Sequence, residues 1–171
     1  GGCATLTPPR VRAPGEKLNL AGIGCGGKGS SDIIKCRKEN VIGLCDVDFN
    51  MMGDAIKTFP NAKKFHDYRV MLDEIGGQLD AVTVSTPDHM HAPASVQAMR
   101  MGKHVYCQKP LTHDVSEARM MAVAAREHNV ATQLGNQGMA LDDFRTPAEA
   151  IGRGVSRADA EPARNASARD R

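Results

Sequence analysis

A glycine-rich segment carries the sharpest chemical signal in the sequence. Residues 22–27 form a G-x-G-x-x-G pattern between an apolar run and a helical stretch, and read Gly22-Ile23-Gly24-Cys25-Gly26-Gly27. In that setting Gly22 permits a tight turn, Gly24 lets backbone approach a pyrophosphate, and Gly27 allows close packing of helix on strand. The N–H groups at the helix start would face the phosphates. We therefore expect a dinucleotide cofactor to contact Gly22, Gly24, Cys25, Gly26 and Gly27; a glycine turn without a ligand is the alternative.

An acidic residue stands where such a site needs one. Asp46 follows Gly27 by 19 residues and ends a second apolar run, Val41–Asp46. A carboxylate at that strand end accepts hydrogen bonds from the adenosine ribose and repels a 2′-phosphate, and no Arg occurs in the next ten residues. We expect Asp46 to bind the ribose, and NAD to be preferred to NADP. An ordinary strand-end acid is the alternative, and Asp48 is the weaker candidate because it lies past the strand end.

A second polar cluster follows the predicted strand Asp80–Ser85. Open α/β sheets bind ligands at the carboxyl ends of their strands, so we expect Ser85 and Thr86 to contact the cofactor. His89 is interpreted as a solvated loop histidine. His91 lies at a helix start, from which it could reach a nicotinamide or a substrate hydroxyl. A purely capping role for His91 stays open.

A third cluster, Cys107-Gln108-Lys109-Pro110, also follows an apolar run. The three ammonium donors of Lys109 could orient a hydroxyl or carbonyl that undergoes hydride transfer. Pro110 is a candidate for a cis peptide bond that fixes the turn. A structural turn without a chemical role is the alternative for this cluster.

The clusters are positioned by short apolar runs that alternate with helical stretches. The apolar runs are Leu18–Ile23, Val41–Asp46, Asp80–Ser85, His104–Cys107 and Val130–Leu134. The helical stretches are Ser30–Lys38, Asn50–Phe59, Pro93–Met101 and one that starts at Asp114, where Glu117 completes a capping box. Within the last helix Val115, Ala118, Ala122 and Ala125 fall on one face. This alternation predicts an α/β fold with a doubly wound parallel sheet, covered by helices on both faces.

Taken together, the three clusters resemble the N-terminal domain of the Gfo/Idh/MocA family, which includes glucose–fructose oxidoreductase and inositol dehydrogenase. The resemblance is carried by Gly22–Gly27, Cys45-Asp46-Val47-Asp48, Thr86-Pro87 with His91, and GKHVYCQKPL from Gly102 to Leu111. It extends over residues 16–150. It implies a Rossmann domain that binds NAD or NADP, an active-site role for Lys109, and cofactor contacts from the other residues named, including His91 and Gln108.

The sequence departs from the family pattern in two respects. Gln108 stands where the family more often has Glu; it could still hydrogen-bond the ribose, but without charge. The family also has a C-terminal α+β domain that supplies the substrate pocket and the oligomer contacts. Residues 151–171 are instead rich in Arg and Ala. We interpret them as a disordered tail, of the kind that a reading-frame slip would produce, and expect the substrate domain to be missing.

The implied function is transfer of a hydride between NAD and a sugar, cyclitol or related polyol, with NADP the less favoured cofactor. Two alternatives stay open: an NAD-dependent glycosidase of the same fold, and a nucleotide-binding fragment without catalysis. The resemblance also implies a homo-oligomer for the full-length protein.

Composition excludes several other classes of function. Hydrophobic residues make up 41% of the chain and charged residues 25%, which are globular values. The net charge is +2, and residues 151–171 carry all of it, so no basic face for nucleic acid is expected. No apolar run approaches the roughly 18 residues of a membrane span. The five cysteines show no CxxC spacing, so neither a zinc site nor a disulfide framework is expected; Cys45 and Cys107 are predicted to be buried thiols.

The first 15 residues, rich in Gly, Pro and Arg, are interpreted as a linker or the remnant of a processed export signal. Cys3 could be a lipid-attachment cysteine or a stray residue in a flexible lead. The segment resembles the spacer after a twin-arginine signal, so both a cytoplasmic and a periplasmic location stay open. The predicted organisation is thus a lead (1–15), a Rossmann domain (16–150) and a tail (151–171).

Overall fold

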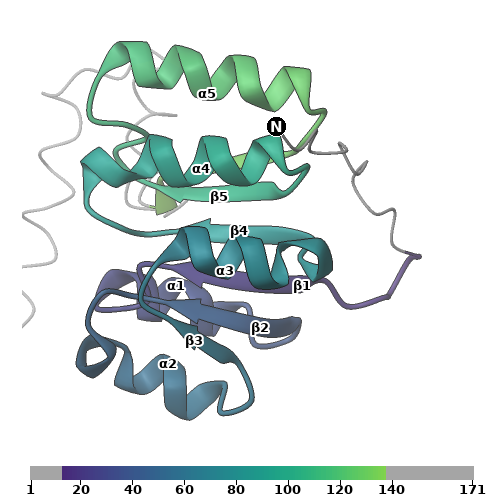
Figure 1. Ribbon diagram of the computed structural model, residues 1–171, viewed down its shortest axis with the longest axis vertical. Coiled ribbons are helices and arrows are strands. Elements are labelled where there is room, and N and C mark those ends of the chain that lie inside the picture. The colour runs from purple at the N-terminus through teal and green to yellow at the C-terminus, as the bar shows by residue number, and fades with distance from the viewer. Residues whose placement is uncertain (1–12, 138–171) are drawn as a thin grey trace, which may run out of the picture. The chain divides into compact units, whose positions relative to one another are not determined.

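A single parallel sheet organises the chain (Figure 1). The computed structural model describes residues 13–137; the expectations for residues 1–12, for the end of the Rossmann domain after residue 137 and for the tail at 151–171 lie outside the described residues. The strands are β1 (Asn19–Ile23), β2 (Asn40–Cys45), β3 (Lys63–Phe65), β4 (Ala81–Val84), β5 (His104–Gln108) and β6 (Thr132–Gly135). Their order is β3-β2-β1-β4-β5-β6, with every neighbouring pair parallel. Because this order reverses direction at β1 and β4, the sheet is doubly wound, and the predicted fold class is confirmed.

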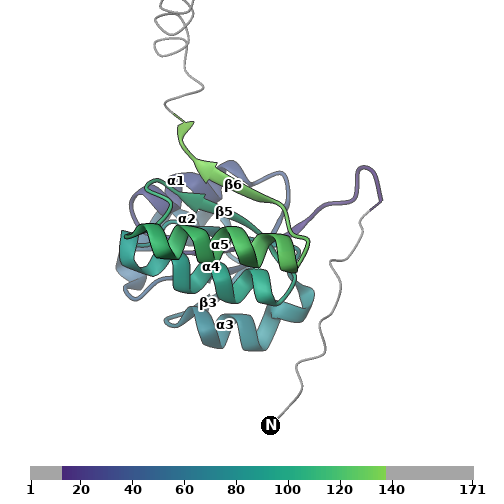
Figure 2. The ribbon, with the colours of Figure 1, turned by 90° about the horizontal axis from the view of Figure 1, so that it is seen from above.

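The helices lie in two layers, one on each face of the sheet. They are α1 (Lys28–Lys35), α2 (Gly53–Thr58), α3 (Tyr68–Ile75), α4 (His91–Arg100) and α5 (Val115–Glu127), with short 3-10 turns at Phe49–Met52, Gly76–Gln78 and Asp88–Met90. Figure 2 shows α1 on one side of the sheet and α3, α4 and α5 on the other. Among the described residues, no helix is long and apolar enough to cross a bilayer.

Each layer of helices buries its own hydrophobic core against the sheet. The larger core lies under α3, α4 and α5, and includes Met71, Leu72 and Met99. The smaller one lies under α1 and α2, and includes Ile33 and Met52. Burial on both faces explains why the strands read as continuous apolar runs in the sequence instead of alternating ones.

Most predicted elements are present, with small shifts at their ends. The helix predicted from Ser30 starts at Lys28, and the strand predicted from Val130 starts at Thr132. Neither β3 nor α3 was predicted. In β3 only Phe65 is buried, while its two lysines are exposed, so the strand lacks an apolar run. The start of α3 is marked by Asp67, whose carboxylate accepts the Arg69 N–H at 2.9 Å.

The last helix differs from the sequence prediction in its buried face. The Asp114 carboxylate accepts the Glu117 N–H at 3.0 Å, as the capping box requires, whereas the Glu117 carboxylate accepts from His113 at 3.1 Å. Val115 is 66% exposed, and the fully buried positions of α5 are Met121 and Ala124. The buried face of α5 is therefore the one that carries Met121 and Ala124, and the predicted face through Val115 is wrong.

The turn between β1 and α1 depends on glycines with different tasks. A Cβ on Gly29, in the first turn of α1, would overlap the carbonyl oxygen of Gly24. A Cβ on Gly24 would lie 2.8 Å from the main chain of Ser85 and Thr86. At Gly27, by contrast, a Cβ would meet nothing within 4 Å, and the backbone there has φ +49° and ψ −114°. Close packing therefore needs Gly29 and Gly24, and the prediction that Gly27 allows close packing of helix on strand is wrong. Gly27 instead supplies a backbone conformation that side chains disfavour.

This difference predicts the effect of adding one methyl group. We expect Gly29→Ala to lower the free energy of unfolding by about 1–3 kcal/mol or more, because helix α1 must move away from the glycine loop. Gly53→Ala is the matched control: Gly53 starts α2 with φ −53° and ψ −40°, and a Cβ there meets nothing within 4 Å. The control should be neutral or stabilising by up to about 1 kcal/mol. Urea unfolding of both variants checks this; equal stabilities would contradict the packing role of Gly29.

Candidate cofactor-binding site

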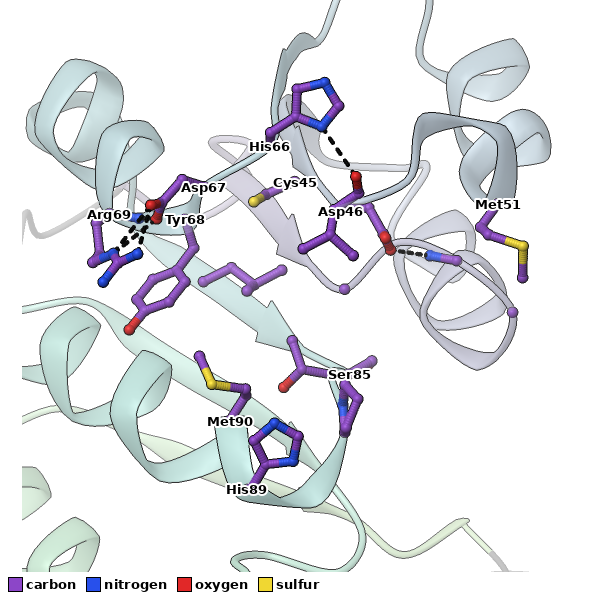
Figure 3. Close-up of a pocket in the computed structure, with 17 residues that line it drawn as sticks. Cys45, Asp46, Met51, His66, Asp67, Tyr68, Arg69, Ser85, His89 and Met90 are labelled. Carbon is purple, nitrogen blue, oxygen red and sulfur yellow. Dashed lines mark hydrogen bonds and ion pairs between the residues drawn. The ribbon is translucent and has the colours of Figure 1, made fainter.

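A cavity of about 640 Å³ lies at the carboxyl ends of β1, β2 and β4 (Figure 3). Its walls come from four loops, at residues 23–27, 45–51, 66–69 and 85–90. The cavity therefore opens where the strand order reverses, which is the position at which open α/β sheets bind their ligands. The position of the cavity and the strand order thus indicate the same ligand-binding crevice.

The glycine loop forms one wall of this cavity and is anchored to the end of β2. Gly24 donates its N–H to the Cys45 carbonyl at 2.9 Å, and Gly26 donates to the Asp46 carboxylate at 2.8 Å. No side chain caps the start of α1 at Gly27, and its first turn carries no acidic residue. Within that turn the Gly29 N–H donates to the Gly26 carbonyl at 2.9 Å. The helix dipole favours negative charge at this uncapped end, so an anion would be stabilised there.

Asp46 is held in place by the main chain on both sides of its carboxylate. One oxygen accepts from Gly26, and the other accepts the Asp48 N–H at 3.1 Å. Figure 3 shows the side chain on the cavity wall beside the glycine loop. Each carboxylate oxygen can accept more than one hydrogen bond, so both remain able to accept from hydroxyl groups.

The opposite wall follows β4. Ser85 and Thr86 line the cavity, and Ser85 donates its N–H to the Ile23 carbonyl at 2.9 Å. The Thr86 hydroxyl oxygen is buried and has no hydrogen-bond partner among the described residues. His89 is exposed and also lines the cavity, so it borders the ligand space as well as solvent. An unpaired hydroxyl on a cavity wall fits a polar ligand, because burying it without a partner costs free energy.

The segment after β3 contributes cavity residues that the sequence analysis missed. Arg69 donates to both carboxylate oxygens of Asp67, at distances from 2.7 to 3.2 Å, and these bonds lower the pKa of Asp67. The His66 ring stacks on Phe49 with 3.8 Å between centroids. Tyr68 lies beside the Asp67–Arg69 ion pair (Figure 3). The N-cap signal of Asp67 was the feature from which this segment could have been found.

Five predicted site residues do not line the cavity, and they are His91, Gln108, Lys109, Gly22 and Cys25. His91 is buried, with Nδ1 2.7 Å from the Pro110 carbonyl oxygen and Nε2 2.8 Å from that of Thr86. A carbonyl oxygen only accepts and a neutral imidazole carries one N–H, so the tautomer of the ring decides which of the two carbonyls accepts from it. His91 therefore ties the loop after β4 to the loop after β5, and its ring is aimed at main chain. The peptide bond before Pro110 is cis, as the sequence analysis suggested.

Gln108 and Lys109 follow β5, next to this tie. Gln108 is buried, whereas Lys109 is exposed and donates its main-chain N–H to the Gln108 side-chain oxygen at 2.8 Å. Gly22 and Cys25 lie inside the fold: a Cβ on Gly22 would meet the Cys25 sulfur at 2.5 Å. The structure thus brings most of the loop together with Asp46, Ser85 and Thr86, and leaves the predicted catalytic lysine on the neighbouring strand end.

The thiols near the cavity are chemically quiet. Burial raises the pKa of Cys25 and of Cys45 to about 12, and that of Cys107 to about 11. Cys45 and Cys107 are buried, as predicted. Within residues 13–137, no group of three or more His, Cys, Asp or Glu side chains could hold a metal ion.

These pKa values predict a stability loss in alkali. The thiols titrate at about 9.0 when unfolded, and near 11–12 when folded, so the folded state keeps protons that the unfolded state releases. Their contribution is complete below about pH 9, and is lost as the pH rises from there toward the folded values. We expect the free energy of unfolding in urea to fall between pH 8 and pH 10.5.

Thiol labelling at pH 8 provides the specific readout. In a Cys3→Ser background, the half-buried Cys36 should react first with a chromogenic disulfide reagent. The three buried thiols should react only when urea unfolds the protein. Rapid labelling of Cys45 in the native protein, identified by mass spectrometry, would contradict its burial.

Comparison with known proteins agrees with this geometry. Residues 18–136 match the Gfo/Idh/MocA family, described as an oxidoreductase family with an NAD-binding Rossmann fold. The chain is 27% identical over 108 residues to levoglucosan dehydrogenase from Pseudarthrobacter phenanthrenivorans. The matched segment covers 63% of this chain and 26% of that protein. It is also 30% identical over 110 residues to a glycosyl hydrolase family 109 protein from Stenotrophomonas maltophilia. That match covers 56% of this chain and 24% of the relative.

A solved structure has the same fold. The crystal structure of myo-inositol 2-dehydrogenase from Lactobacillus plantarum aligns with a TM-score of 0.69 and 25% identity, covering 81% of this chain and 42% of that one. The chain spans about a quarter of the length of the two relatives named above. The resemblance seen in the motifs is confirmed over residues 18–136.

Proposed function

The chain belongs to the Gfo/Idh/MocA family of oxidoreductases, and from this premise we propose that its cavity binds NAD. The observation that carries the proposal is the bond between Gly26 and Asp46, which holds the glycine loop beside an acidic side chain, as a pyrophosphate cradle next to a ribose acceptor would require. The cradle is the uncapped start of α1, and the acceptor is the Asp46 carboxylate. When bound, the nicotinamide supplies the hydride acceptor or donor.

The residues present fit a dinucleotide in three respects. The loop offers main-chain donors at a positive helix end, which suits phosphate oxygens. Asp46 offers acceptors to ribose hydroxyls. Thr86, whose buried hydroxyl oxygen lacks a partner among the described residues, lines the same cavity. Main-chain donors, a carboxylate acceptor and a hydroxyl residue thus line one crevice, as a ligand that carries both phosphates and hydroxyls requires.

A preference for NAD over NADP follows from the charges around the cavity. Asp46 would repel a 2′-phosphate at hydrogen-bond distance. The arginine that lines the cavity, Arg69, is already bound to Asp67 by several hydrogen bonds. Recruiting it to a phosphate would break that pair.

We expect Asp46→Asn to narrow the preference for NAD without unfolding the loop. The amide keeps an acceptor for the Gly26 N–H and removes the negative charge, so NADP affinity should rise by about tenfold relative to NAD. Asp48→Asn is the matched control, since Asp48 is an exposed carboxylate that caps a 3-10 turn, a role that Asn also fills. Calorimetric titration of both cofactors measures this. Equal NAD and NADP affinities in the unchanged protein would refute the assignment of Asp46.

We further propose that Lys109 acts on the substrate of the complete enzyme, a sugar, cyclitol or related polyol. Its side chain is exposed, and its main chain is fixed by Gln108, so the ammonium projects from an ordered strand end. From there it can donate to the reacting hydroxyl and stabilise that oxygen as the proton leaves. The substrate class is supported by the levoglucosan and myo-inositol dehydrogenases to which the chain is similar.

Replacing this lysine should separate turnover from cofactor binding. We expect Lys109→Ala to lower the hydride-transfer rate on the order of 10²–10⁴-fold, and to change NAD affinity little, because the lysine lies off the cavity wall. Single-turnover absorbance of NADH with a panel of polyols gives the rate, and calorimetry gives the affinity. Loss of NAD binding with an unchanged rate would instead assign Lys109 to the cofactor.

The same assay distinguishes the two alternatives from the sequence analysis. Release of the aglycone from an aryl glycoside without net NADH would indicate an NAD-dependent glycosidase. Binding of NAD without turnover of any polyol or glycoside would indicate a nucleotide-binding domain without catalysis.

A further inference from the structure

We propose that Asp32, on helix α1, is the positioning residue that sets the two substrate-side loops of this site. Its carboxylate joins the end of β4 to the end of β5, and through Gln108 it fixes the main chain of Lys109. The inference rests on the proposed function in one respect, the action of Lys109 on substrate. The sequence analysis assigned no role to Asp32.

The contacts of Asp32 reach three elements. The residue is 5% exposed. One carboxylate oxygen accepts from the Ser85 hydroxyl at 3.0 Å, and from the Gln108 amide nitrogen at 2.8 Å. The other oxygen is paired with Lys28, one turn earlier on the same helix. A buried carboxylate with this set of donors holds residues from other elements in place.

The orientation of the Gln108 amide is fixed by its other partner. The Lys109 main-chain N–H can only donate, and it lies 2.8 Å from the Gln108 side-chain oxygen. The amide nitrogen must therefore face Asp32, whose carboxylate only accepts. The resulting chain of bonds runs from Asp32 through Gln108 to the main chain of Lys109, and leaves the ammonium of Lys109 outside it.

This arrangement gives a physical reason for Gln108. With Glu at the same position, two carboxylate oxygens would meet at the distance that now joins Asp32 to the amide. Two carboxylates so close cannot both be ionised, so one must take up a proton or the pair must separate. Given Asp32 on α1, position 108 requires a side chain that donates on one side and accepts on the other, which Gln does and ionised Glu does not.

Other titratable groups near Asp32 do not replace this pairing. Lys28 is half exposed, and stabilises the charge of Asp32 from the solvent side. The Cys36 thiol faces the Asp32 main-chain carbonyl at 3.7 Å. Burial raises the pKa of Tyr106 on β5, and the negative charge of Asp32 raises it further. The Lys28 and Cys36 contacts both stay within α1 and its C-cap, so neither joins Asp32 to the loop that carries Lys109.

A reciprocal exchange of the two side chains tests the pairing. The variants are Gln108→Glu, Asp32→Asn and the double variant, with Gln133→Glu on the exposed neighbouring strand β6 as a charge control. In Gln108→Glu, we expect the equilibrium constant for unfolding at pH 8 to rise on the order of 10²-fold, with a smaller rise at pH 5, where one carboxyl can hold a proton. The double variant again sets an amide donor against a carboxylate. It should therefore recover most of the stability that Gln108→Glu loses, and the difference between pH 8 and pH 5 should disappear. Gln133→Glu should show neither.

The stability cycle decides the inference even if one variant fails to fold. A double variant that folds where Gln108→Glu does not supports the pairing, because an unrelated packing defect would not be repaired by Asp32→Asn. A double variant no more stable than Gln108→Glu, or a Gln108→Glu protein as stable as the unchanged one at both pH values, would overturn it.

The positioning role has its own readout in the complete enzyme. Gln108→Glu should lower the hydride-transfer rate on the order of 10²-fold while NAD affinity stays within a few-fold, and the double variant should restore the rate. Lys109→Ala separates the two levels of the proposal. If Lys109→Ala leaves the rate unchanged, the proposed role of the lysine fails. If it lowers the rate while the exchange of residues 32 and 108 does not move it, the positioning role of Asp32 fails.

Discussion

The site depends on how closely other main chain can approach Gly24. The first turn of α1 lies against its carbonyl oxygen through Gly29, and the main chain of Ser85 and Thr86 lies against its α-carbon. Three segments therefore meet at a point where two residues have no side chain. Any separation there would widen the crevice between the glycine loop and the loop after β4, which are two of its walls. The dimensions of the cavity follow from this contact.

Around that contact, polar side chains of the site and of the loops behind it are held by main-chain partners. Asp46 is oriented by the N–H groups of Gly26 and Asp48, and His91 is aimed at the carbonyls of Thr86 and Pro110. Bonds of this kind fix a side chain without using a flexible partner, so the binding groups are ordered before a ligand arrives. The cavity thus has a negative carboxylate beside a positive helix end, an arrangement that suits a molecule with hydroxyls next to phosphates.

The sequence predicted the parts of the site whose signal is local. The glycine loop and Asp46 are separated by one helix and one strand, so their spacing, together with the flanking apolar runs and helical stretch, predicts them. Residues 66–69 were missed, since β3 is three residues long and buries only Phe65, which leaves no apolar run to detect. Asp32 was missed for a different reason. Its partners Ser85 and Gln108 are 53 and 76 residues away in the chain, and pairings at such separations leave no local pattern.

Gln108 illustrates how a motif position and a role can diverge. From the pattern alone, Gln108 appears as an uncharged substitute for Glu that could hydrogen-bond a ribose. In the structure both ends of its amide already have partners inside the protein, Asp32 on one side and the main chain of Lys109 on the other. A direct contact with the ribose stays a prediction, but the internal bonds alone are enough to account for the residue. The donor side of this amide is matched by the Asp32 carboxylate on α1, so position 108 is better understood together with residue 32 than from the motif around it.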